Sequence, residues 1–412
     1  MWYNIGMKDI KSLDFNSVIA TKTITRFGKT REVHFVFDKH SDEFKAMCKL
    51  ADALKVLDEY RRMTYTQITE SIIKNLQSLK HADGFTIVKF DFVGYFESLS
   101  TKYIYDYILK GKLDDKVREI MNAYCAQVPY AYAGIGISNT FADIMTNVFK
   151  EQLLSNFGGV GVIGAYSYVD DFVLIFDKNV AKEYVVEIID KTIKQVFYMP
   201  HAVPNTTDFY KQEPKFSYLN NSNLPLSFIN LGYLFNVFKS KDEISFNIGL
   251  PTYKKEAFKK LIKQVILDNK DNVEALRTYL YAYAHRVVTK VKGASGKGKN
   301  VSYSRLASSY ILSNYYECFD AETVEFYKNV IFDCFEELGL TLPYYLADRS
   351  ESSPYNLHHN LIKHKALVLN KKFGLPYKNL VKLVQPITDK DLTNMEYYKV
   401  AQILLDHMTQ VF

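Results

Sequence analysis

Two aspartates stand side by side near the middle of the chain, between apolar segments. Asp170 and Asp171 follow residues 162–169 and precede the apolar run 172–176. An unpaired charge is costly to bury, so we expect the pair at a turn between two strands, where it binds a cation. A solvated Asp-Asp turn is the alternative, because aspartate is a common turn residue.

A third carboxylate, Asp91, closes the apolar run 85–90, which predicts a short strand. Together with Asp170 and Asp171 it supplies the oxygen ligands that two Mg²⁺ ions about 4 Å apart need for in-line phosphoryl transfer. One ion would activate an attacking hydroxyl, and the other would hold a triphosphate and its leaving pyrophosphate. Mn²⁺ prefers similar ligands and could replace Mg²⁺. These three aspartates are the candidate catalytic and metal-binding residues.

A mixed α/β block is predicted around these carboxylates. Short apolar runs indicate strands, helical spacing of apolar residues indicates helices between them, and a glycine-centred hairpin precedes them at 17–38. The block ends near residue 250. From residue 251 onward the pattern is almost entirely helical, except that the glycine-rich, basic segment 290–300 is predicted to be a loop or a disordered tether.

The residues around the carboxylates resemble motifs A, B and C of reverse transcriptases. Asp91 is followed five positions later by the aromatic Phe96. Gly134 and Ser138 form a G-x-x-x-S pattern at a predicted helix start, and residues 168–171 read Tyr-Val-Asp-Asp. The three motifs occur in the family's order. The resemblance covers roughly residues 20–248.

Motif B suggests a particular lineage. Residues 138–144, SNTFADI, resemble the variant found in bacterial antiphage reverse transcriptases of the abortive-infection and "unknown group" lineage. Ala133 and Asn139 replace the Gln and Pro that are common in this motif, and the Val-Thr-Gly string typical of retrons does not occur. The resemblance implies a role in antiphage defence with a non-coding RNA template.

The resemblance also implies an architecture. Residues 1–250 would form the α/β palm and fingers of a right-hand polymerase. Residues 251–412 would form a mostly α-helical thumb and C-terminal domain. The implied activity is that of an RNA-directed DNA polymerase, with dNTPs, an RNA template and a DNA product as partners.

Several residues receive nucleotide-binding roles from the resemblance. Phe96 would pack under the sugar of the incoming nucleotide, where a ribose 2′-hydroxyl would collide with the ring. This arrangement favours deoxynucleotides, although a phenylalanine here could equally be a core residue. Gly134 and Ser138 would shape the same site.

Basic residues would bind the triphosphate. Arg26 and Arg31, with Lys29, lie at the tip of the predicted hairpin and would correspond to the fingers strands that clamp it. Lys211, or else Lys215, would correspond to the lysine that protonates pyrophosphate.

Contacts to nucleic acid are expected from the palm and the thumb. Tyr168 begins the Tyr-Val-Asp-Asp motif, and Gly232 resembles part of the Leu-Gly start of a primer-grip hairpin. Residues 251–300 carry twelve Lys and Arg against four acids, a net charge of +8. Such a segment favours sequence-independent binding to a phosphate backbone. The predicted helix there presents a basic set comprising Lys254, Lys255, Lys259 and Lys260.

Composition and cysteine spacing bear on the cellular compartment and on membrane association. The four cysteines are far apart and match no zinc-site spacing, which favours a reducing cytoplasm. No export signal and no run of 18 apolar residues is present, so we expect no membrane partner. The oligomeric state stays open, a homo-oligomer included.

Three rival functions remain. The same carboxylates could support untemplated or protein-primed DNA synthesis, since a tyrosine hydroxyl can replace a primer hydroxyl. A catalytically silent RNA-binding scaffold is the second rival, disfavoured by the presence of all three aspartates. An RNA-directed RNA polymerase is the third, disfavoured by Phe96.

Overall fold

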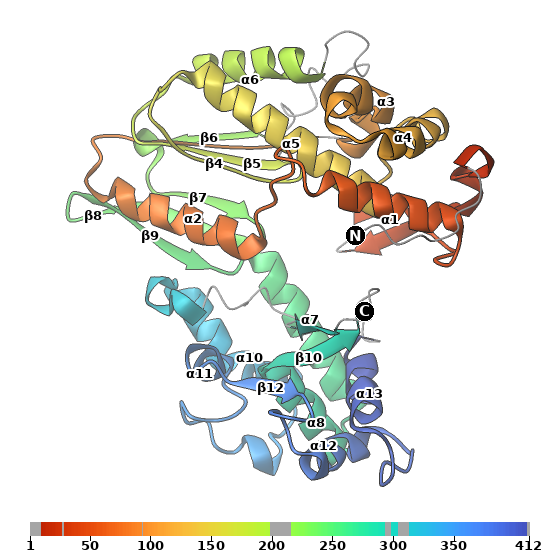
Figure 1. Cartoon of the computed structure of the whole chain (residues 1–412). Coiled ribbons are helices and arrows are strands. Elements are labelled where there is room, and N and C mark those ends of the chain that lie inside the picture. The colour runs from red at the N-terminus through yellow and green to blue at the C-terminus, as the bar shows by residue number, and fades with distance from the viewer. Residues whose placement is uncertain are drawn as a thin grey trace. The chain divides into compact units, whose positions relative to one another are not determined.

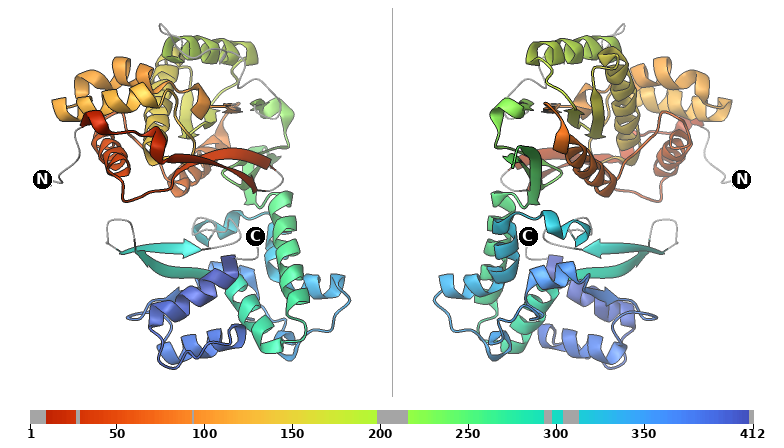
Figure 2. Two further views of the ribbon diagram at one scale, coloured as in Figure 1. Left: turned by 90° about the vertical axis from the view of Figure 1, so that its right-hand side faces the viewer. Right: turned by 90° about the vertical axis from the view of Figure 1, so that its left-hand side faces the viewer.

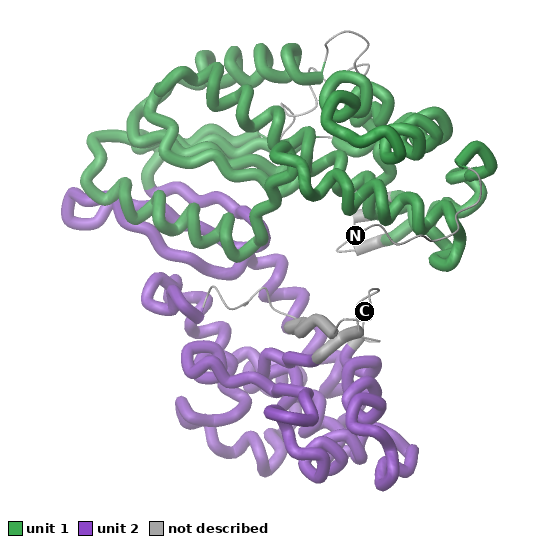
Figure 3. The backbone as a smooth tube through the Cα atoms, in the orientation of Figure 1, with its two compact units in different colours: residues 1–224 green, residues 225–412 purple. Residues whose placement is uncertain are grey.

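The computed structural model describes residues 10–26, 29–92, 94–197, 216–292, 298–303 and 313–409. The chain divides into two compact units, residues 1–224 and 225–412 (Figure 3). Each unit has its own helices and sheets. No helix among the described residues is long and apolar enough to cross a bilayer. The functional boundary near residue 250 remains a prediction.

A four-stranded antiparallel sheet forms the centre of the first unit (Figure 1). Its strand order is β4-β5-β3-β6. The strands are β3 (Thr86–Asp91), β4 (Val162–Tyr168), β5 (Asp171–Phe176) and β6 (Phe216–Asn220). The predicted strand that ends at Asp91 and the hairpin around the paired aspartates are therefore both present, and they are neighbours in this sheet.

Helices cover both faces of this sheet. On one face, Phe149 of α5 packs edge-on against the stacked rings of Phe90 and Phe172, whose centroids are 4.9 Å apart. On the other face, the Asn75 side chain of α2 donates to the carbonyl of Ile163 on β4. The principal helices of the unit are α1 (Asp42–Leu54), α2 (Tyr65–Ser78), α4 (Asp115–Gln127), α5 (Gly136–Phe157) and α6 (Lys182–Phe197).

Shorter turns complete the first unit. A continuous helical segment runs from α3 (Thr101–Tyr103) through a π-helical stretch, η5 (Ile104–Leu109), into η6 (Lys110–Lys112). Single 3₁₀ turns are η1 (Ile10–Ser12), η2 (Asn16–Val18), η3 (Leu79–His81), η4 (Phe96–Ser98) and η7 (Asn221–Asn223).

The predicted N-terminal hairpin is confirmed. Strands β1 (Ile19–Arg26) and β2 (Lys29–Val36) pair antiparallel, from Ile19 opposite Val36 to Arg26 opposite Lys29 (Figure 2). The side chains at its tip, which include Arg26, Lys29 and Arg31, lie outside the described residues.

The second unit combines an antiparallel sheet with helices. The sheet consists of β7 (Leu226–Asn230), β8 (Tyr233–Ser240) and β9 (Glu243–Gly249). The helices are α7 (Thr252–Asp268), α8 (Val273–Ala284), α10 (Ala321–Glu337), α11 (Leu357–Ile362), α12 (Tyr377–Val384) and α13 (Tyr397–Thr409). Its 3₁₀ turns are η8 (Tyr316–Cys318), η9 (Tyr344–Leu346) and η10 (Gln385–Ile387).

The predicted loop at 290–300 is wrong at both ends. Strands β10 (Arg286–Lys292) and β11 (Gly298–Tyr303) form a hairpin, and β10 also pairs in parallel with β12 (Ala366–Leu369). The buried Val287 and Leu367 lie in register between β10 and β12 and supply apolar surface to this sheet. β-Branched residues favour such a half-buried strand despite the surrounding lysines.

Candidate active site at the end of the four-stranded sheet

The register of the sheet brings the predicted aspartates together. Asp91, the last residue of β3, lies directly opposite Asp171, the first residue of β5. Tyr168 lies opposite Asp171 on the other side, so Val169 and Asp170 form the two-residue turn of the β4–β5 hairpin. The structure therefore gathers residues that are 79 positions apart in the sequence at one end of the sheet.

The turn has an unfavourable backbone conformation. Val169 has a φ of +58°, which a β-branched residue rarely adopts. Two hydrogen bonds hold the turn. The Thr146 hydroxyl on α5 donates to the Val169 carbonyl at 2.7 Å, and the Phe92 N–H donates to the Asp170 carbonyl at 3.2 Å. Strain of this kind persists only where surrounding contacts determine it, and it is frequent at functional sites.

Asp170 is in an environment that disfavours its negative charge. Burial raises the pKa of its carboxyl group to about 7, and the charge of Asp91 and a hydrogen bond shared with it add to the shift. Asp171 contributes a smaller effect of the same sign. Like-charged carboxyls this close need either a shared proton or a cation. The Asp91–Asp170 pair thus has the donor chemistry of a divalent metal site.

Asp171 has a different partner. The Lys89 ammonium on β3 lies 3.1 Å from its Oδ1. Within the described part of the chain, no three His, Cys, Asp or Glu side chains converge closely enough to form a ready-made metal cluster. The predicted trio is therefore a contacting pair, Asp91 and Asp170, with Asp171 beside it in an ion pair.

Tyr168 is held by the segment that links α1 to α2. Its ring lies against Tyr65, with centroids 4.1 Å apart, and its hydroxyl accepts a hydrogen bond from Arg62 at 3.0 Å. Arg62 also makes an ion pair of 3.5 Å with Asp143 on α5. Asn147 fixes the linking segment by donating to the carbonyls of Glu59 and Arg61. The β4–β5 hairpin, α5 and the linking segment are thereby joined.

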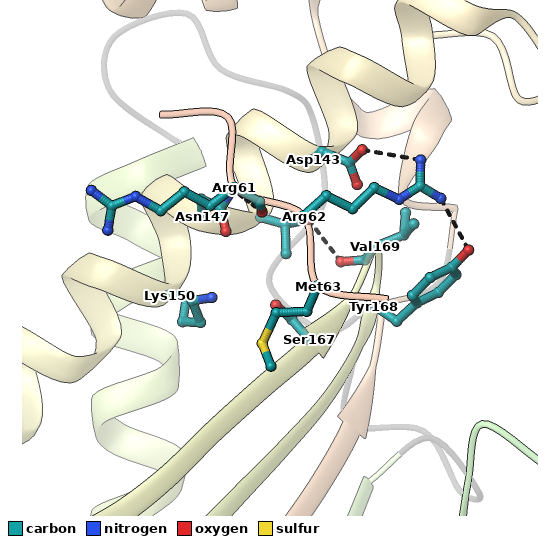
Figure 4. A pocket seen from close by; sticks show the side chains of 10 residues that line it. Arg61, Arg62, Met63, Asp143, Asn147, Lys150, Ser167, Tyr168 and Val169 are labelled. Atoms are coloured by element: carbon teal, nitrogen blue, oxygen red, sulfur yellow. Dashed lines mark hydrogen bonds and ion pairs between the residues drawn. The ribbon is translucent and has the colours of Figure 1, made fainter. Parts of the chain in front are cut away.

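Arg61, Arg62, Asp143, Asn147 and Tyr168 line a small pocket beside the turn (Figure 4). Figure 4 shows Arg62 reaching between Asp143 and Tyr168, while Met63 and Lys150 line another part of the wall. The cavity volume is about 10 Å³, which is room for about one water molecule. Burial raises the pKa of Asp143, and the Arg62 charge opposes that shift. Sequence reasoning missed Arg62, although two adjacent arginines before a helix were a visible signal.

Phe96 lies in η4, shortly after β3. Its ring is partly buried and packs against the core of the first unit. The preceding Tyr95 is buried, and its hydroxyl is 2.9 Å from that of Thr146, which also donates to the turn between β4 and β5. Contact of Phe96 with a nucleotide sugar remains a prediction.

The motif B residues dock the N-terminal hairpin. Gly134 has a φ of +103°, and a Cβ atom there would collide with the His34 carbonyl and the Val33 side chain of β2. The His34 N–H donates to the Ala133 carbonyl at 2.8 Å. Ser138 is fully buried, and its hydroxyl accepts the N–H of Tyr132 at 2.9 Å. Their predicted role in nucleotide binding is untested, whereas their packing role is evident.

The predicted triphosphate-binding residues lie outside the described part of the chain. The side chains of Arg26 and Arg31 are not among those described, and Lys211 and Lys215 lie in the gap at 198–215. Their roles stay predictions.

In the second unit, the predicted primer-grip residue Gly232 occupies a tight turn. Leu231 and Gly232, both with positive φ, join β7 to β8. The Lys254 side chain lies directly over Gly232, where a Cβ atom would meet its ammonium. Burial lowers the pKa of Lys254 to about 8.

The other lysines of α7 differ in their partners. Lys255 is buried and pairs with Glu322 of α10 at 2.7 Å. Lys259 pairs with Glu337 of the same helix at 2.8 Å. Lys260 is exposed. Two of the four lysines therefore form ion pairs with α10. Binding of nucleic acid by α7 remains a prediction.

Comparison with known proteins gives distant similarities. No family model and no curated protein matches the chain. The chain is similar to an apo telomerase from Candida tropicalis truncated from the C-terminal domain, with 13% identity, a TM-score of 0.37 and coverage of 52% of both chains. It is also similar to telomerase from Candida albicans in complex with a fragment of telomeric RNA, with 14% identity and a TM-score of 0.41. That match covers 93% of this chain and 64% of the other, so this chain spans about half to two thirds of these proteins.

Proposed function

We propose that this chain is a metal-dependent nucleotidyltransferase of the reverse-transcriptase class. The observation that carries the proposal is the Asp91–Asp170 carboxyl pair, held at a strained turn at one end of an antiparallel sheet. This pair would bind Mg²⁺ or Mn²⁺, and Asp171 lies beside it, directly opposite Asp91. When bound, the metal ions would activate the attacking hydroxyl and stabilise the leaving pyrophosphate.

The chain's own residues position this cluster. Thr146 and the Phe92 N–H bind the two carbonyls of the turn, and the Asp170 carboxyl shares a hydrogen bond with Asp91. Arg62 and Tyr65 orient Tyr168 beside the cluster. Such preorganisation lowers the cost of reaching the reactive geometry.

The finer assignment rests on the sequence motifs. Phe96 five residues after Asp91 favours dNTPs over ribonucleotides, and the SNTFADI segment supports the antiphage reverse-transcriptase lineage. We accordingly propose RNA-templated DNA synthesis, with a non-coding RNA as template, in antiphage defence. Untemplated or protein-primed synthesis would use the same carboxylates.

The test is incorporation of labelled deoxynucleotides by purified protein with Mg²⁺ and co-purified RNA. Incorporation should vanish in an Asp170→Ala/Asp171→Ala variant and persist in Glu187→Gln, which removes an exposed acid on α6. Sequencing the product with and without RNA separates templated from untemplated synthesis. Equal incorporation by the wild type and the double variant would overturn the proposal and favour an RNA-binding scaffold.

A further inference from the structure

One lysine shares the sheet face of the acidic cluster. Lys89 and Asp91 are two residues apart on β3, so their side chains emerge on the same face. Asp91 lies directly opposite Asp171, which places Lys89 diagonally across from Asp171 on the neighbouring strand. The Lys89 ammonium is 3.1 Å from Oδ1 of Asp171.

The pair is partly shielded from water. The side chains of Lys89 and Asp171 are 22% and 24% exposed, and Oδ1 of Asp171 is buried. Solvent and salt screen such a pair less than one on the open surface. The acidic cluster is therefore divided: Asp91 and Asp170 contact each other, whereas Asp171 contacts an internal cation.

Resting on the proposed function, we propose that Lys89 is a positioning residue of the metal site. Its ammonium serves as the resident counter-ion of Asp171 and keeps that carboxylate out of the metal's coordination. Asp91 and Asp170 are then the carboxylates that hold the divalent ion.

This division of roles has a measurable electrostatic consequence. A positive charge near a cation site weakens cation binding, and its loss strengthens it. Replacing Lys89 with the similarly shaped Met would leave the Asp171 charge without its counter-ion and add its field to the site. The expected gain in Mn²⁺ affinity is about three- to tenfold for a charge several ångströms away.

The experiment measures Mn²⁺ binding to the full chain, free of nucleic acid, through the EPR signal of unbound Mn²⁺. Thermal unfolding in EDTA is recorded for the same samples. The variants are Lys89→Met, Lys89→Arg, Asp171→Asn and the double variant Lys89→Met/Asp171→Asn. Lys45→Met is the matched control, because it removes a lysine from an ion pair of 3.0 Å on α1.

The proposal predicts a distinct pattern. Lys89→Met binds Mn²⁺ more tightly but unfolds at a lower temperature in EDTA, because Asp171 has lost its partner. Lys89→Arg keeps both the Mn²⁺ affinity and the unfolding temperature in EDTA close to those of the wild type, because arginine retains the positive charge. Asp171→Asn lowers Mn²⁺ affinity by only about three- to tenfold, because a negative charge near the site is lost while no ligand is removed. The double variant recovers stability relative to Lys89→Met, and Lys45→Met leaves Mn²⁺ affinity unchanged.

Other outcomes overturn the proposal and separate it from the proposed function. If Asp171→Asn lowers Mn²⁺ affinity by about a hundredfold or more, Asp171 is a metal ligand and the role given to Lys89 is wrong. Unchanged affinity in Lys89→Met would also show that this role is wrong. In both cases Asp91→Asn and Asp170→Asn still abolish binding, and the proposed function stands. If the wild type binds no Mn²⁺ that depends on Asp91 or Asp170, both proposals fail.

Discussion

At the scale of single residues, the buried carboxyl group of Asp170 reduces the stability of the folded chain when it is ionised. Its carboxyl group has a pKa of about 7 in the folded chain, against an ordinary value of 3.8. A raised pKa means that the folded state binds the proton more tightly than the unfolded state. The resulting stabilisation is complete below about pH 4 and is lost as the pH rises towards 7.

Asp170→Asn should therefore stabilise the metal-free protein while abolishing activity. The amide imitates the protonated carboxyl, so we expect a gain of about 2 kcal/mol at pH 8 that disappears near pH 4. Denaturant unfolding in EDTA across this pH range measures it. A variant that is less stable than the wild type at pH 8 would show that the Asp170 charge is not unfavourable in the folded chain.

The stabilisation of the wild type by Mg²⁺ should increase with pH, whereas the stabilisation by the Asp170 proton decreases with pH. Protons compete with the metal for the Asp91–Asp170 pair, so the rise in Tm that Mg²⁺ causes in the wild type should grow as the pH increases from 5.5 to 8 through about 7. Asp170→Asn should show no such growth. Thermal unfolding with Mg²⁺ and with EDTA provides the comparison, and a stabilisation independent of pH would count against metal binding at this pair.

The proposed role of Phe96 can be tested through the selection of deoxynucleotides over ribonucleotides. If the ring excludes a ribose 2′-hydroxyl, Phe96→Ala should raise the ratio of ribonucleotide to deoxynucleotide incorporation by about tenfold or more. Single-nucleotide extension assays with matched dNTP and rNTP pairs measure this ratio. An unchanged ratio would return Phe96 to the role of a core residue, consistent with its packing against the first unit.

At the scale of secondary-structure elements, the sequence predicted the strands that carry the aspartates, but it did not predict the ion pairs that join one element to another. Strand β3 and the β4–β5 hairpin followed from apolar runs that end at aspartates. The Lys89–Asp171 pair could not be predicted, because it depends on the register between two strands far apart in the sequence. The partners of Lys255 and Lys259 depend in the same way on the packing of α10 against α7.

The loop between α4 and α5 supplies an element-scale prediction. Gly134 combines a left-handed φ with close approach to β2, so Gly134→Ala should destabilise the chain by about 2 kcal/mol or more. The loss should be largest in the β1–β2 hairpin, as hydrogen exchange would show. Gly136→Ala is the control, because a Cβ atom at that position would meet no neighbour. Equal effects of the two substitutions would argue against the docking role.

At the scale of the whole molecule, the net charge of a segment does not show how many of its lysines are available to bind phosphate. The segment 251–300 carries an excess of eight positive charges, yet Lys255 and Lys259 are paired with acids of α10. Composition shows how many lysines are present, whereas only the fold shows which of them are already neutralised. The exposed Lys260 is the better candidate for a phosphate contact.

This difference predicts contrasting salt effects on nucleic-acid binding. Lys260→Met should reduce the slope of log K against log salt by about one, because one phosphate contact is lost. Lys255→Met should leave the slope unchanged, since its ammonium is already paired with Glu322. Fluorescence anisotropy with an RNA–DNA duplex over a salt series tests both. The reverse pattern would show that the ion pair opens on binding.

The parallel pairing of β10 with β12 also affects how the chain folds during synthesis. Arg286 lies opposite Ala366, so β10 cannot form its parallel pairing until a strand 80 residues further along the chain has been synthesised. At about 5–20 residues per second, that delay is roughly 4–16 s. During it, one edge of the β10–β11 hairpin has no neighbouring strand, and an open strand edge is a template for association with other chains.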